Sequence, residues 1–317
     1  MRHYRFMVLS VLVLCMTCLI LICSGCDRPQ GNIDFTKAQE PQTAVEESGG
    51  EPLRIAFASV MSPKETRQSY QILVNYISQQ LNRPVVLLQR RTYEELNSLM
   101  TNGDADVAFF STGAYSAYHG KMPVDLLAMV QTNGTTKYRT YVIVAADSEV
   151  SSFNDLQGHV FAFTDPLSYS GRLAIDFLLH DEGTTPEYYF KRYFYTYSHD
   201  KSIWAVANHL ADAASIDSQI YDYIMQTNPQ LGQQVRILTV LPEAPTGPVV
   251  LRSNMAESEK EELRRIFYRM DSVPSLETAL KNAVIDKFVP PDPNAYAALR
   301  ATYGQISHIV GDYYEEH

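Results

Sequence analysis

Cysteine is confined to one end of this 317-residue sequence: all four cysteines lie in the first 26 residues, and none follows. A disulfide-stapled fold is therefore excluded for the rest of the chain. Basic residues are also few, with 26 Lys and Arg against 36 Asp and Glu, and they form no run. The net charge of −10 argues against a nucleic-acid-binding protein, which needs a basic surface to displace counterions. We therefore expect no nucleic-acid partner.

Enzyme motifs are absent as well. The sequence contains no P-loop, no glycine-rich dinucleotide fingerprint, no His-Glu-x-x-His and no nucleophile elbow. Its eight histidines show no metal-ligand spacing, so we expect no metal ion, no other cofactor and no catalytic residues. A dispersed Ser/His/Asp triad is recognised by geometry rather than by sequence, which leaves an exported hydrolase open as an alternative.

An export signal begins the chain. Arg2 and Arg5 precede an apolar stretch over residues 7–22, which is shorter than the roughly 20 residues that span a bilayer comfortably. The following Cys-Ser-Gly-Cys resembles a bacterial lipobox, whose last cysteine is lipidated and becomes the first residue of the mature protein. We predict a lipoprotein signal peptide over residues 1–25, lipidation of Cys26 and a flexible tether over residues 26–52. An ordinary secretory signal and an uncleaved anchor are the alternatives.

Asp27 follows the predicted lipidated cysteine directly. This resembles the inner-membrane retention signal of some Gram-negative lipoproteins. The expected location is therefore the periplasmic face of the inner membrane, with the membrane contacted through the lipid anchor.

Short β-rich runs alternate with helical patterns from Leu53 onward, which is typical of an α/β fold with mostly parallel sheets flanked by helices. A second unit of the same kind begins near residue 140 and predicts two lobes. Thr92 and Glu95 form a capping-box pattern that predicts a helix start. Strands are expected at residues 53–60, 85–89, 106–110, 138–146, 160–164, 192–197, 213–216, 235–240 and 248–252. Helices are expected at residues 63–81, 93–103, 152–156, 172–180, 198–209, 257–270, 276–283 and 293–310.

The strongest candidate binding motif is Ser168-Tyr169-Ser170-Gly171, between an expected strand and an expected helix. Unpaired amides and a partial positive charge at a helix N-terminus bind an oxyanion without lysine or arginine. Ser168 and Ser170 would add hydroxyl donors, and Gly171 would let the backbone approach the anion closely. The alternative is an ordinary serine N-cap.

Two more strand-to-helix junctions carry candidate polar residues. His199 is placed to donate a hydrogen bond to an anion, although an exposed loop histidine is as good an interpretation of the residue alone. Asp217 and Ser218 follow the strand expected at residues 213–216. A carboxylate there would repel a fully ionised ligand and accept a hydrogen bond from a protonated one, while the alternative is a helix cap.

Aromatic residues at expected strand ends are candidate cleft-lining residues. Tyr93, Phe110 and Tyr115 lie at or just after such ends and would present rings and hydroxyls to a ligand. Trp204, the single tryptophan, is expected in the core.

These motifs, in this order, resemble the phosphate/phosphite/phosphonate-binding proteins of ABC importers, the PhnD-like family. The matching pieces span residues 53–252 and read LRIAF, TYEEL, GDADVAFFSTGAYSAY, FAFTDPLSYSG, YSHDKSIWAVANHLADAASIDSQIYD and GPVVLR. The resemblance implies a two-lobed periplasmic-binding-protein fold of type II. Lobe one would comprise residues 53–138 and 246–317 and lobe two residues 139–245, with the ligand held between them.

By this resemblance, Ser168, Tyr169 and Ser170 match the hydroxyl triplet that holds the phosphonate group. His199 matches the histidine that contacts the same oxygens. The middle residue of the triplet is usually threonine, so the larger Tyr169 is expected either to turn away from the pocket or to reshape it.

The remaining site residues follow from the same resemblance. Tyr93 and Phe110 match aromatic positions of the opposing lobe, and Asp217 and Ser218 match a polar pair on the cleft wall. Tyr115 follows Ser-Thr where many relatives have Gly-Pro.

Members that bind an aminoalkyl phosphonate use acidic side chains for its ammonium group. The corresponding positions here are Gln219 and Gly247, so aminoethylphosphonate is disfavoured.

The resulting hypothesis is a monomeric, lipid-anchored binding protein that captures a small phosphorus oxyanion (phosphonate, phosphite or phosphate) for an ABC permease. A ligand sensor of the same fold that signals to a membrane histidine kinase is the main alternative. The exported hydrolase is a third.

Overall fold

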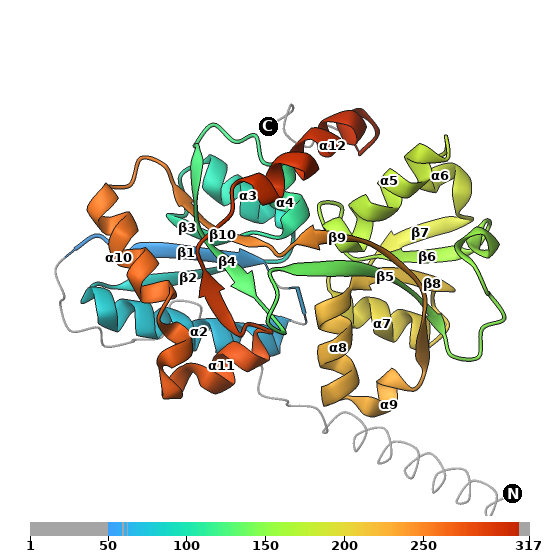
Figure 1. Cartoon of the computed structure of the whole chain (residues 1–317), viewed down its shortest axis with the longest axis horizontal. Coiled ribbons are helices and arrows are strands. Elements are labelled where there is room, and N and C mark those ends of the chain that lie inside the picture. The colour runs from blue at the N-terminus through green and yellow to red at the C-terminus, as the bar shows by residue number, and fades with distance from the viewer. Residues whose placement is uncertain (1–49, 59, 62, 311–317) are drawn as a thin grey trace, which may run out of the picture. The chain divides into compact units, whose positions relative to one another are not determined.

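The computed structural model describes residues 50–58, 60–61 and 63–310, all within the unit Glu47–His317 (Figure 1). The predicted signal peptide, Cys26, Asp27 and most of the predicted tether lie outside the described residues. Within the described part, no helix combines the length and the apolar character that crossing a membrane requires.

The first sheet has the strand order β11-β4-β10-β3-β1-β2. Residues along β1 alternate between two buried clusters, with Ile55 and Phe57 in one and Ala56 and Ala58 in the other, because successive side chains of a strand point to opposite faces. Both faces are covered by helices, and we call this part the first lobe. Its strands are β1 (Leu53–Ala58), β2 (Val85–Arg90), β3 (Val107–Phe109), β4 (Val124–Gln131), β10 (Pro248–Arg252) and β11 (Lys287–Val289).

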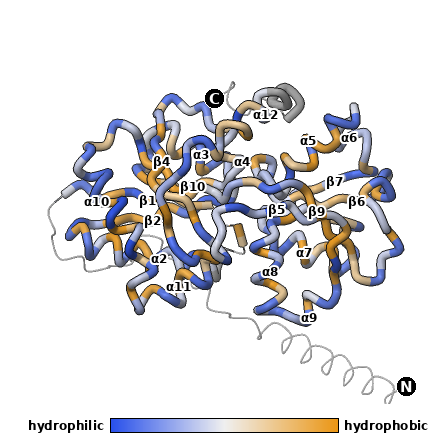
Figure 2. The backbone as a smooth tube through the Cα atoms, viewed as in Figure 1, coloured by the Kyte–Doolittle hydropathy of each residue, from blue (hydrophilic) through white to orange (hydrophobic). Residues whose placement is uncertain are grey.

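The helices of the first lobe include α3, whose start agrees with the sequence pattern. The Thr92 side chain accepts from the backbone N–H of Glu95, and the Glu95 side chain completes the predicted capping box. Figure 2 shows α10 as mainly hydrophilic, and its few apolar residues, such as Leu263 and Phe267, are buried. The helices are α2 (Pro63–Leu81), α3 (Tyr93–Thr101), α4 (Thr112–Ala117), α10 (Glu257–Phe267), α11 (Glu277–Asn282) and α12 (Asn294–Val310), with turns η4 (Met270–Ser272) and η5 (Pro274–Leu276).

The second sheet, with its helices, forms the second lobe and has the order β7-β6-β8-β5-β9. Its strands are β5 (Lys137–Ala145), β6 (Val160–Phe163), β7 (Arg192–Tyr195), β8 (Ala213–Asp217) and β9 (Val235–Pro245). Its helices are α5 (Ala174–Asp181), α6 (Pro186–Tyr189), α7 (His199–Ala207), α8 (Ser218–Thr227) and α9 (Pro229–Gly232), with turns η2 (Phe153–Leu156) and η3 (Tyr169–Leu173). The α/β fold with two helix-flanked sheets is therefore confirmed.

Each sheet is mixed rather than mostly parallel in its pairing. β5 pairs antiparallel with both β8 and β9, and β10 pairs antiparallel with both β3 and β4. These two strands enter their sheets from the other lobe rather than through a β-α-β crossover, so the parallel arrangement that such crossovers impose does not apply to them.

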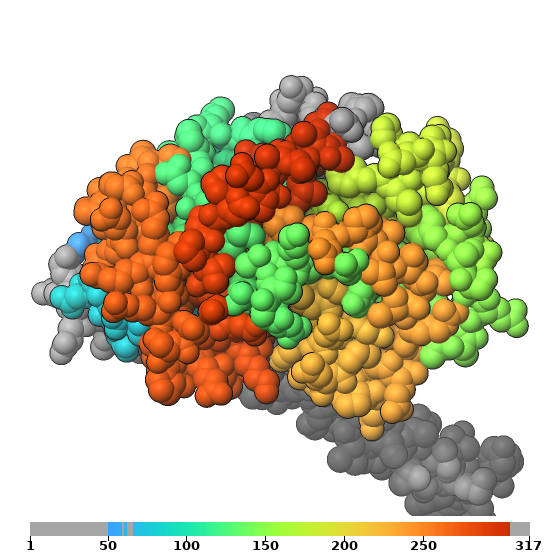
Figure 3. Space-filling model, viewed as in Figure 1, coloured from blue at the N-terminus to red at the C-terminus, as the bar shows by residue number. Residues whose placement is uncertain are grey.

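The chain passes between the lobes through two short segments, residues 132–136 and 246–247. The segments lie side by side, since the backbone N–H of Thr246 donates to the carbonyl of Thr136 at 2.9 Å and Lys137 pairs with Pro245. The hydroxyl of Tyr296 in α12 donates to the carbonyl of Thr246 at 2.7 Å. Helix α12 also contacts both α4 and α5, and Figure 3 shows it in red between the atoms of the two lobes.

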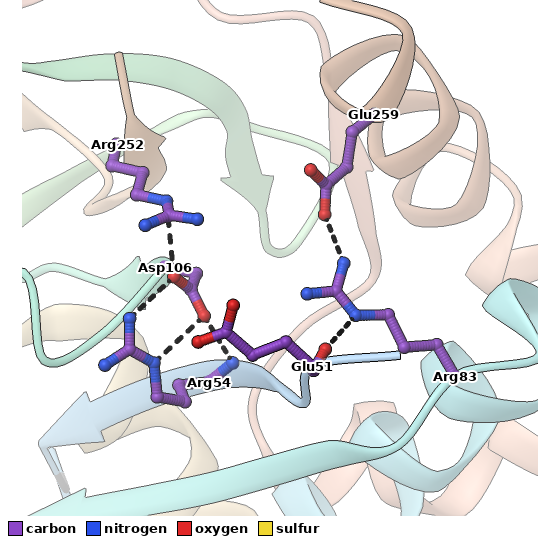
Figure 4. Close-up of polar contacts among 6 residues, drawn as sticks. All are labelled: Glu51, Arg54, Arg83, Asp106, Arg252 and Glu259. Carbon is purple, nitrogen blue, oxygen red and sulfur yellow. Dashed lines mark hydrogen bonds and ion pairs between the residues drawn. The ribbon is translucent and has the colours of Figure 1, made fainter. Parts of the chain in front are cut away.

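A buried carboxylate, that of Asp106, connects the amino-terminal ends of β1 and β3 (Figure 4). Asp106 accepts from the backbone N–H of Arg54 at 2.8 Å and from its guanidinium at 2.9 and 3.2 Å. Arg252, at the end of β10, lies 3.2 Å from the same carboxylate. A neighbouring pair, Arg83 and Glu259, is joined at 2.6 Å. Burial acts to raise the pKa of Asp106, but the Arg54 hydrogen bonds and the charge of Arg252 hold it below its ordinary value.

The fold differs from the expectations in two respects. Strands β4 and β11 were not expected; β4 is rich in Leu, Ala and Met, which favour helices, and only its tertiary pairing with β10 and β11 makes it a strand. Trp204 is 52% exposed rather than in the core. The buried face of α7 runs through His199, Ser202, Ile203 and Val206, and Trp204 lies off that stripe.

Candidate functional site

A cavity of about 110 Å³ lies between the two lobes, at the carboxyl ends of β1, β3 and β8. This is the end of α/β sheets at which ligands bind. The volume corresponds to roughly three or four water molecules. The cavity therefore has room for a small polyatomic ion.

Six of the nine predicted ligand-binding residues line this cavity: Tyr93, Phe110, Ser168, Ser170, His199 and Asp217. They come from both lobes. Their role in binding stays a prediction, but the structure does bring together residues that lie more than 120 positions apart in the sequence.

The other three predicted residues do not line the cavity. Tyr169 turns away from it, and its ring packs edge-on against Tyr138, 6.3 Å between centroids, because the wide turn at η3 directs this side chain into the core. The Ser218 hydroxyl accepts from the backbone N–H of Arg139 at 3.0 Å. The Tyr115 ring packs against Tyr296, 5.0 Å between centroids.

The Ser168 turn is both a helix cap and a wall of the cavity. The Ser168 hydroxyl accepts from the backbone N–H of Gly171 at 3.0 Å, so Ser168 is an N-cap, as the alternative interpretation predicts. Packing also requires Gly171, since a Cβ there would lie 2.4 Å from the Cβ of Thr164 on the strand side. Ser170 is 1% exposed and has no capping role.

His199 is held as a neutral imidazole. Its Nδ1 accepts from the backbone N–H of Asp217 at 3.2 Å and lies 3.3 Å from the Thr164 hydroxyl. Burial lowers the pKa of His199 to about 3. Because Nδ1 is occupied as an acceptor, the ring hydrogen resides on Nε2, which leaves one N–H donor for the cavity.

Asp217 is the N-cap of α8 and the one carboxylate among the described residues that line the cavity. Its Oδ1 accepts from the backbone N–H groups of Gln219 at 2.7 Å and Ile220 at 3.4 Å. Burial raises the pKa of Asp217 to about 7, although the two amide hydrogen bonds act in the opposite direction. At neutral pH the group therefore interconverts between a hydrogen-bond donor and an anion.

The electrostatics of the cavity come from helix ends. The N-termini of α3, α4, η3, α7 and α8 all contribute lining residues, while no Lys or Arg is among the described residues that line it. Helix N-termini carry unpaired amides and a partial positive charge that favour anions. The same described residues contain no group of three or more side chains suited to a metal ion.

Sequence reasoning missed several lining residues. Tyr138 lies on the crossing strand β5, and its fully buried hydroxyl interacts with the side chains of Thr112 and Ser170; burial raises its pKa. Its position where the chain is expected to cross between the lobes is a sequence signal that could have identified Tyr138 as a lining residue. Residues 283–285, which also line the cavity, belong to the C-terminal part of the chain beyond the motif-bearing region, and nothing in their sequence marks them.

The lobes touch around the cavity. The backbone N–H of Tyr93 donates to the Asp165 carboxylate at 3.2 Å, and that of His199 donates to the carbonyl of Val60 at 3.0 Å. A Cβ on Gly113 of α4 would lie 2.2 Å from the carbonyl oxygen of Leu167, so this glycine allows α4 to approach the Ser168 turn. The structure is therefore a closed arrangement of the two lobes.

The family profile described as "ABC transporter, phosphonate, periplasmic substrate-binding protein" matches residues 55–296. The chain belongs to this family. Among curated relatives, it is 26% identical over 156 residues to the phosphonates-binding periplasmic protein of Escherichia coli, covering 48% of this chain and 46% of that protein. It is 27% identical over 173 residues to the phosphate-import protein PhnD of Mycolicibacterium smegmatis, covering 53% and 50%. The alignments thus span about half the length of the curated relatives.

Solved structures support the fold. A binding protein component of an ABC phosphonate transporter from Pseudomonas aeruginosa superposes with a TM-score of 0.73 at 22% identity, covering 82% of this chain and 89% of that one. PhnD1 from Prochlorococcus marinus, solved in complex with methylphosphonate, gives a TM-score of 0.74 at 18% identity, with coverage of 80% and 98%.

Proposed function

We propose that this protein binds a small phosphorus oxyanion in the cavity between its lobes and delivers it to an ABC permease in the inner membrane. The observation that carries the proposal is the convergence of Ser168, Ser170 and His199 on a cavity that helix N-termini make favourable for an anion, with no lysine or arginine among its described lining residues. The names of the relatives, which include a phosphonate-binding and a phosphate-import protein, point to the same ligand class. No observation on the described residues favours the sensor or the hydrolase alternative.

An aminoalkyl phosphonate is a poor candidate ligand. Gln219 and Gly247, the positions where an ammonium-binding acid is expected, both line the cavity. A Cβ on Gly247 would lie 2.2 Å from the carbonyl oxygen of Phe110, so no acidic side chain fits there without a backbone shift. We favour a phosphonate with an uncharged substituent, phosphite or phosphate.

The proposed location is the periplasmic face of the inner membrane, with the protein anchored through lipidated Cys26. The periplasmic part of this proposal is supported by the family description. Incorporation of labelled fatty acid into the wild-type protein, but not into the Cys26→Ala variant, is the expected result; equal labelling of both would remove the anchor from the proposal.

Thermal unfolding of the purified protein with phosphate, phosphite, methylphosphonate, aminoethylphosphonate and sulfate tests the ligand class. A ligand at about a thousand times its dissociation constant stabilises by roughly 4 kcal/mol. We expect a shift with at least one phosphorus oxyanion and little with aminoethylphosphonate. If no phosphorus oxyanion shifts the midpoint, the proposed function is wrong.

Ser170→Ala is the sharpest variant for the same test, because Ser170 has no capping role. Loss of a hydrogen bond to a charged ligand costs about 1.5–3 kcal/mol, so affinity should fall roughly tenfold to a hundredfold. Ser168→Ala should also lower stability by about 1 kcal/mol, since it removes a cap. Ser272→Ala, which removes an exposed hydroxyl, serves as the control. Unchanged affinity of Ser170→Ala would place the anion elsewhere.

A further inference from the structure

Val284 has a backbone conformation that valine rarely adopts. Its φ is +58°, in the left-handed region, directly after helix α11. The backbone N–H of Val284 donates to the carbonyl of Lys281 and that of Ile285 to the carbonyl of Leu280, both at 3.0 Å, which defines a Schellman cap. Glycine is the usual residue at this position, because a β-branched side chain is strained there. The turn is further held by the Thr132 hydroxyl, which donates to the carbonyl of Val284 at 2.6 Å.

The strained residue lies at the binding cavity. Val284 lines the inner cavity together with Ala283 and Ile285. It also lines a second, outer cavity of about 440 Å³, whose other lining residues are mainly polar. Gln219, Val284 and Ile285 are the residues common to both cavities, so they form the wall between the two.

The inner cavity has two chemically different sides. The second lobe contributes Ser168, Ser170 and His199, which suit an oxyanion. The first lobe contributes Ser111 and Thr112 and a larger apolar set, which includes Tyr70, Phe109, Val130, Ala283, Val284 and Ile285. An oxyanion bound to the second lobe therefore directs its remaining substituent toward a surface that includes Val284.

Among the described residues, positive φ is easier to explain at three of the four other non-glycine positions; the fourth, Tyr197, lies two residues before helix α7. Asn82 and Asn133 are asparagines, which tolerate the left-handed region. His209 occupies the same Schellman position after α7 and has an exposed side chain. Val284 is the β-branched case among these residues, and it is at the candidate site, where backbone strain is most often retained for function.

We propose that Val284 is a specificity-determining residue, which closes the apolar side of the inner cavity against the outer one and limits the ligand to an oxyanion with a short apolar substituent. The proposal rests on the proposed function, and it adds a substrate class and a residue that selects it. It predicts that the Val284 side chain makes the affinity depend on the length of the substituent.

The test is the Val284→Gly variant, with dissociation constants measured calorimetrically for methylphosphonate and n-propylphosphonate. In a fitted apolar site, each methylene changes affinity on the order of tenfold. The wild-type protein should prefer methylphosphonate, and Val284→Gly should reduce this preference about tenfold or more, because the wall to the outer cavity is opened. Glycine adopts the native backbone conformation freely, so the variant should fold.

His209→Gly is the matched control. Its Schellman bonds, His209 N–H to Val206 at 3.0 Å and Leu210 N–H to Ala205 at 2.8 Å, repeat those at Val284, but it does not line the inner cavity. Both variants place glycine at a left-handed Schellman position, so an effect of the freed backbone would appear in both. His209→Gly should therefore keep the wild-type preference for methylphosphonate.

A second variant, Val284→Asn, keeps a side chain of similar size that tolerates positive φ but makes the wall polar. It should lose affinity for methylphosphonate while phosphate and phosphite bind as before. The proposal is overturned if Val284→Gly retains the wild-type ratio or if His209→Gly shifts it equally. These outcomes leave the proposed function standing, whereas a wild-type protein that binds no phosphorus oxyanion would remove the proposed function itself.

Discussion

At the scale of single residues, one hydrogen bond determines which nitrogen of His199 carries the proton. The backbone N–H of Asp217 donates to Nδ1 of His199, which fixes the imidazole as a neutral Nε2–H donor. The side chain of Asp217 is at the same time buried, with its pKa raised to about 7. The residue that orients the histidine is thus also the residue whose charge opposes an anion.

Asp217 should make the unliganded protein less stable as pH rises. The folded protein keeps the Asp217 proton up to about pH 7, while the unfolded chain releases it near 3.8. Between these values the folded state binds more protons, so the free energy of unfolding falls with rising pH. Asp217→Asn keeps an oxygen acceptor for the α8 cap and removes the titration. We expect the variant to gain stability relative to wild type from about pH 4 to pH 7.

Denaturant unfolding of both proteins at several pH values measures this difference. Glu149→Gln, which removes an exposed carboxylate, is the control. The same Asp217→Asn variant should bind oxyanions with an affinity that falls less steeply above pH 7, because no carboxylate forms beside the ligand. A stability difference between the variant and the wild type that is constant over the whole pH range would contradict the raised pKa of Asp217.

At the scale of elements, sequence reasoning succeeded where local chemistry decides the structure. The capping box at Thr92 and Glu95 and the strand-to-helix junctions at Ser168, His199 and Asp217 are local features, and the structure has them where the pattern placed them. β4 was missed because its strand state comes from pairing partners more than 100 residues away. The wall at Val284 was missed for the same reason: only the fold brings residues 283–285 to the cavity.

The Asp106 cluster, formed by Arg54, Asp106 and Arg252, joins the central strands β1, β3 and β10 at the ends away from the cavity. Asp106→Asn should lower the free energy of unfolding by about 2 kcal/mol, because charge-assisted hydrogen bonds to Arg54 are lost. The pKa of Asp106 is held below its ordinary value of 3.8, so its contribution is present above that pH and is lost as pH falls below it. The stability difference should therefore vanish in acid.

Chemical denaturation at pH 7 and pH 3 checks this prediction, with Asp104→Asn, an exposed acid two positions earlier, as the control. The ligand affinity of Asp106→Asn should remain that of the wild type, since the cluster lies at the strand ends opposite to the cavity. A large loss of affinity would mean that the cluster and the cavity are coupled.

At the scale of the whole molecule, the two lobes are joined by two short segments and meet again at the contact of α4 with the Ser168 turn. A ligand that touches both lobes binds the closed arrangement better than an open one and therefore shifts the equilibrium toward closure. Gly113 lies at a point of close approach between the lobes. Its lack of a side chain is what allows α4 to lie against Leu167.

Gly113→Ala should affect the closure of the two lobes without destabilising the folded protein. Alanine favours a helix by about 1 kcal/mol over glycine, so the unliganded variant should be at least as stable as the wild type. Its Cβ would lie 2.2 Å from the Leu167 carbonyl oxygen, which forces the lobes apart next to Ser168 and should lower ligand affinity about tenfold or more. Gly304→Ala in α12, where a Cβ meets nothing within 4 Å, controls for helix propensity and should bind normally.

Trp204 supplies the optical readout for the same experiment. It is the single tryptophan, half-exposed, and it lines a groove with Met61 of the first lobe, so its surroundings depend on how the lobes meet. Ligand should change its emission in the wild type and in Gly304→Ala. In Gly113→Ala the change should require more ligand, because part of the binding free energy is spent on overcoming the α4 clash. Identical titration curves for all three proteins would mean that ligand-induced closure does not require the contact between Gly113 and Leu167.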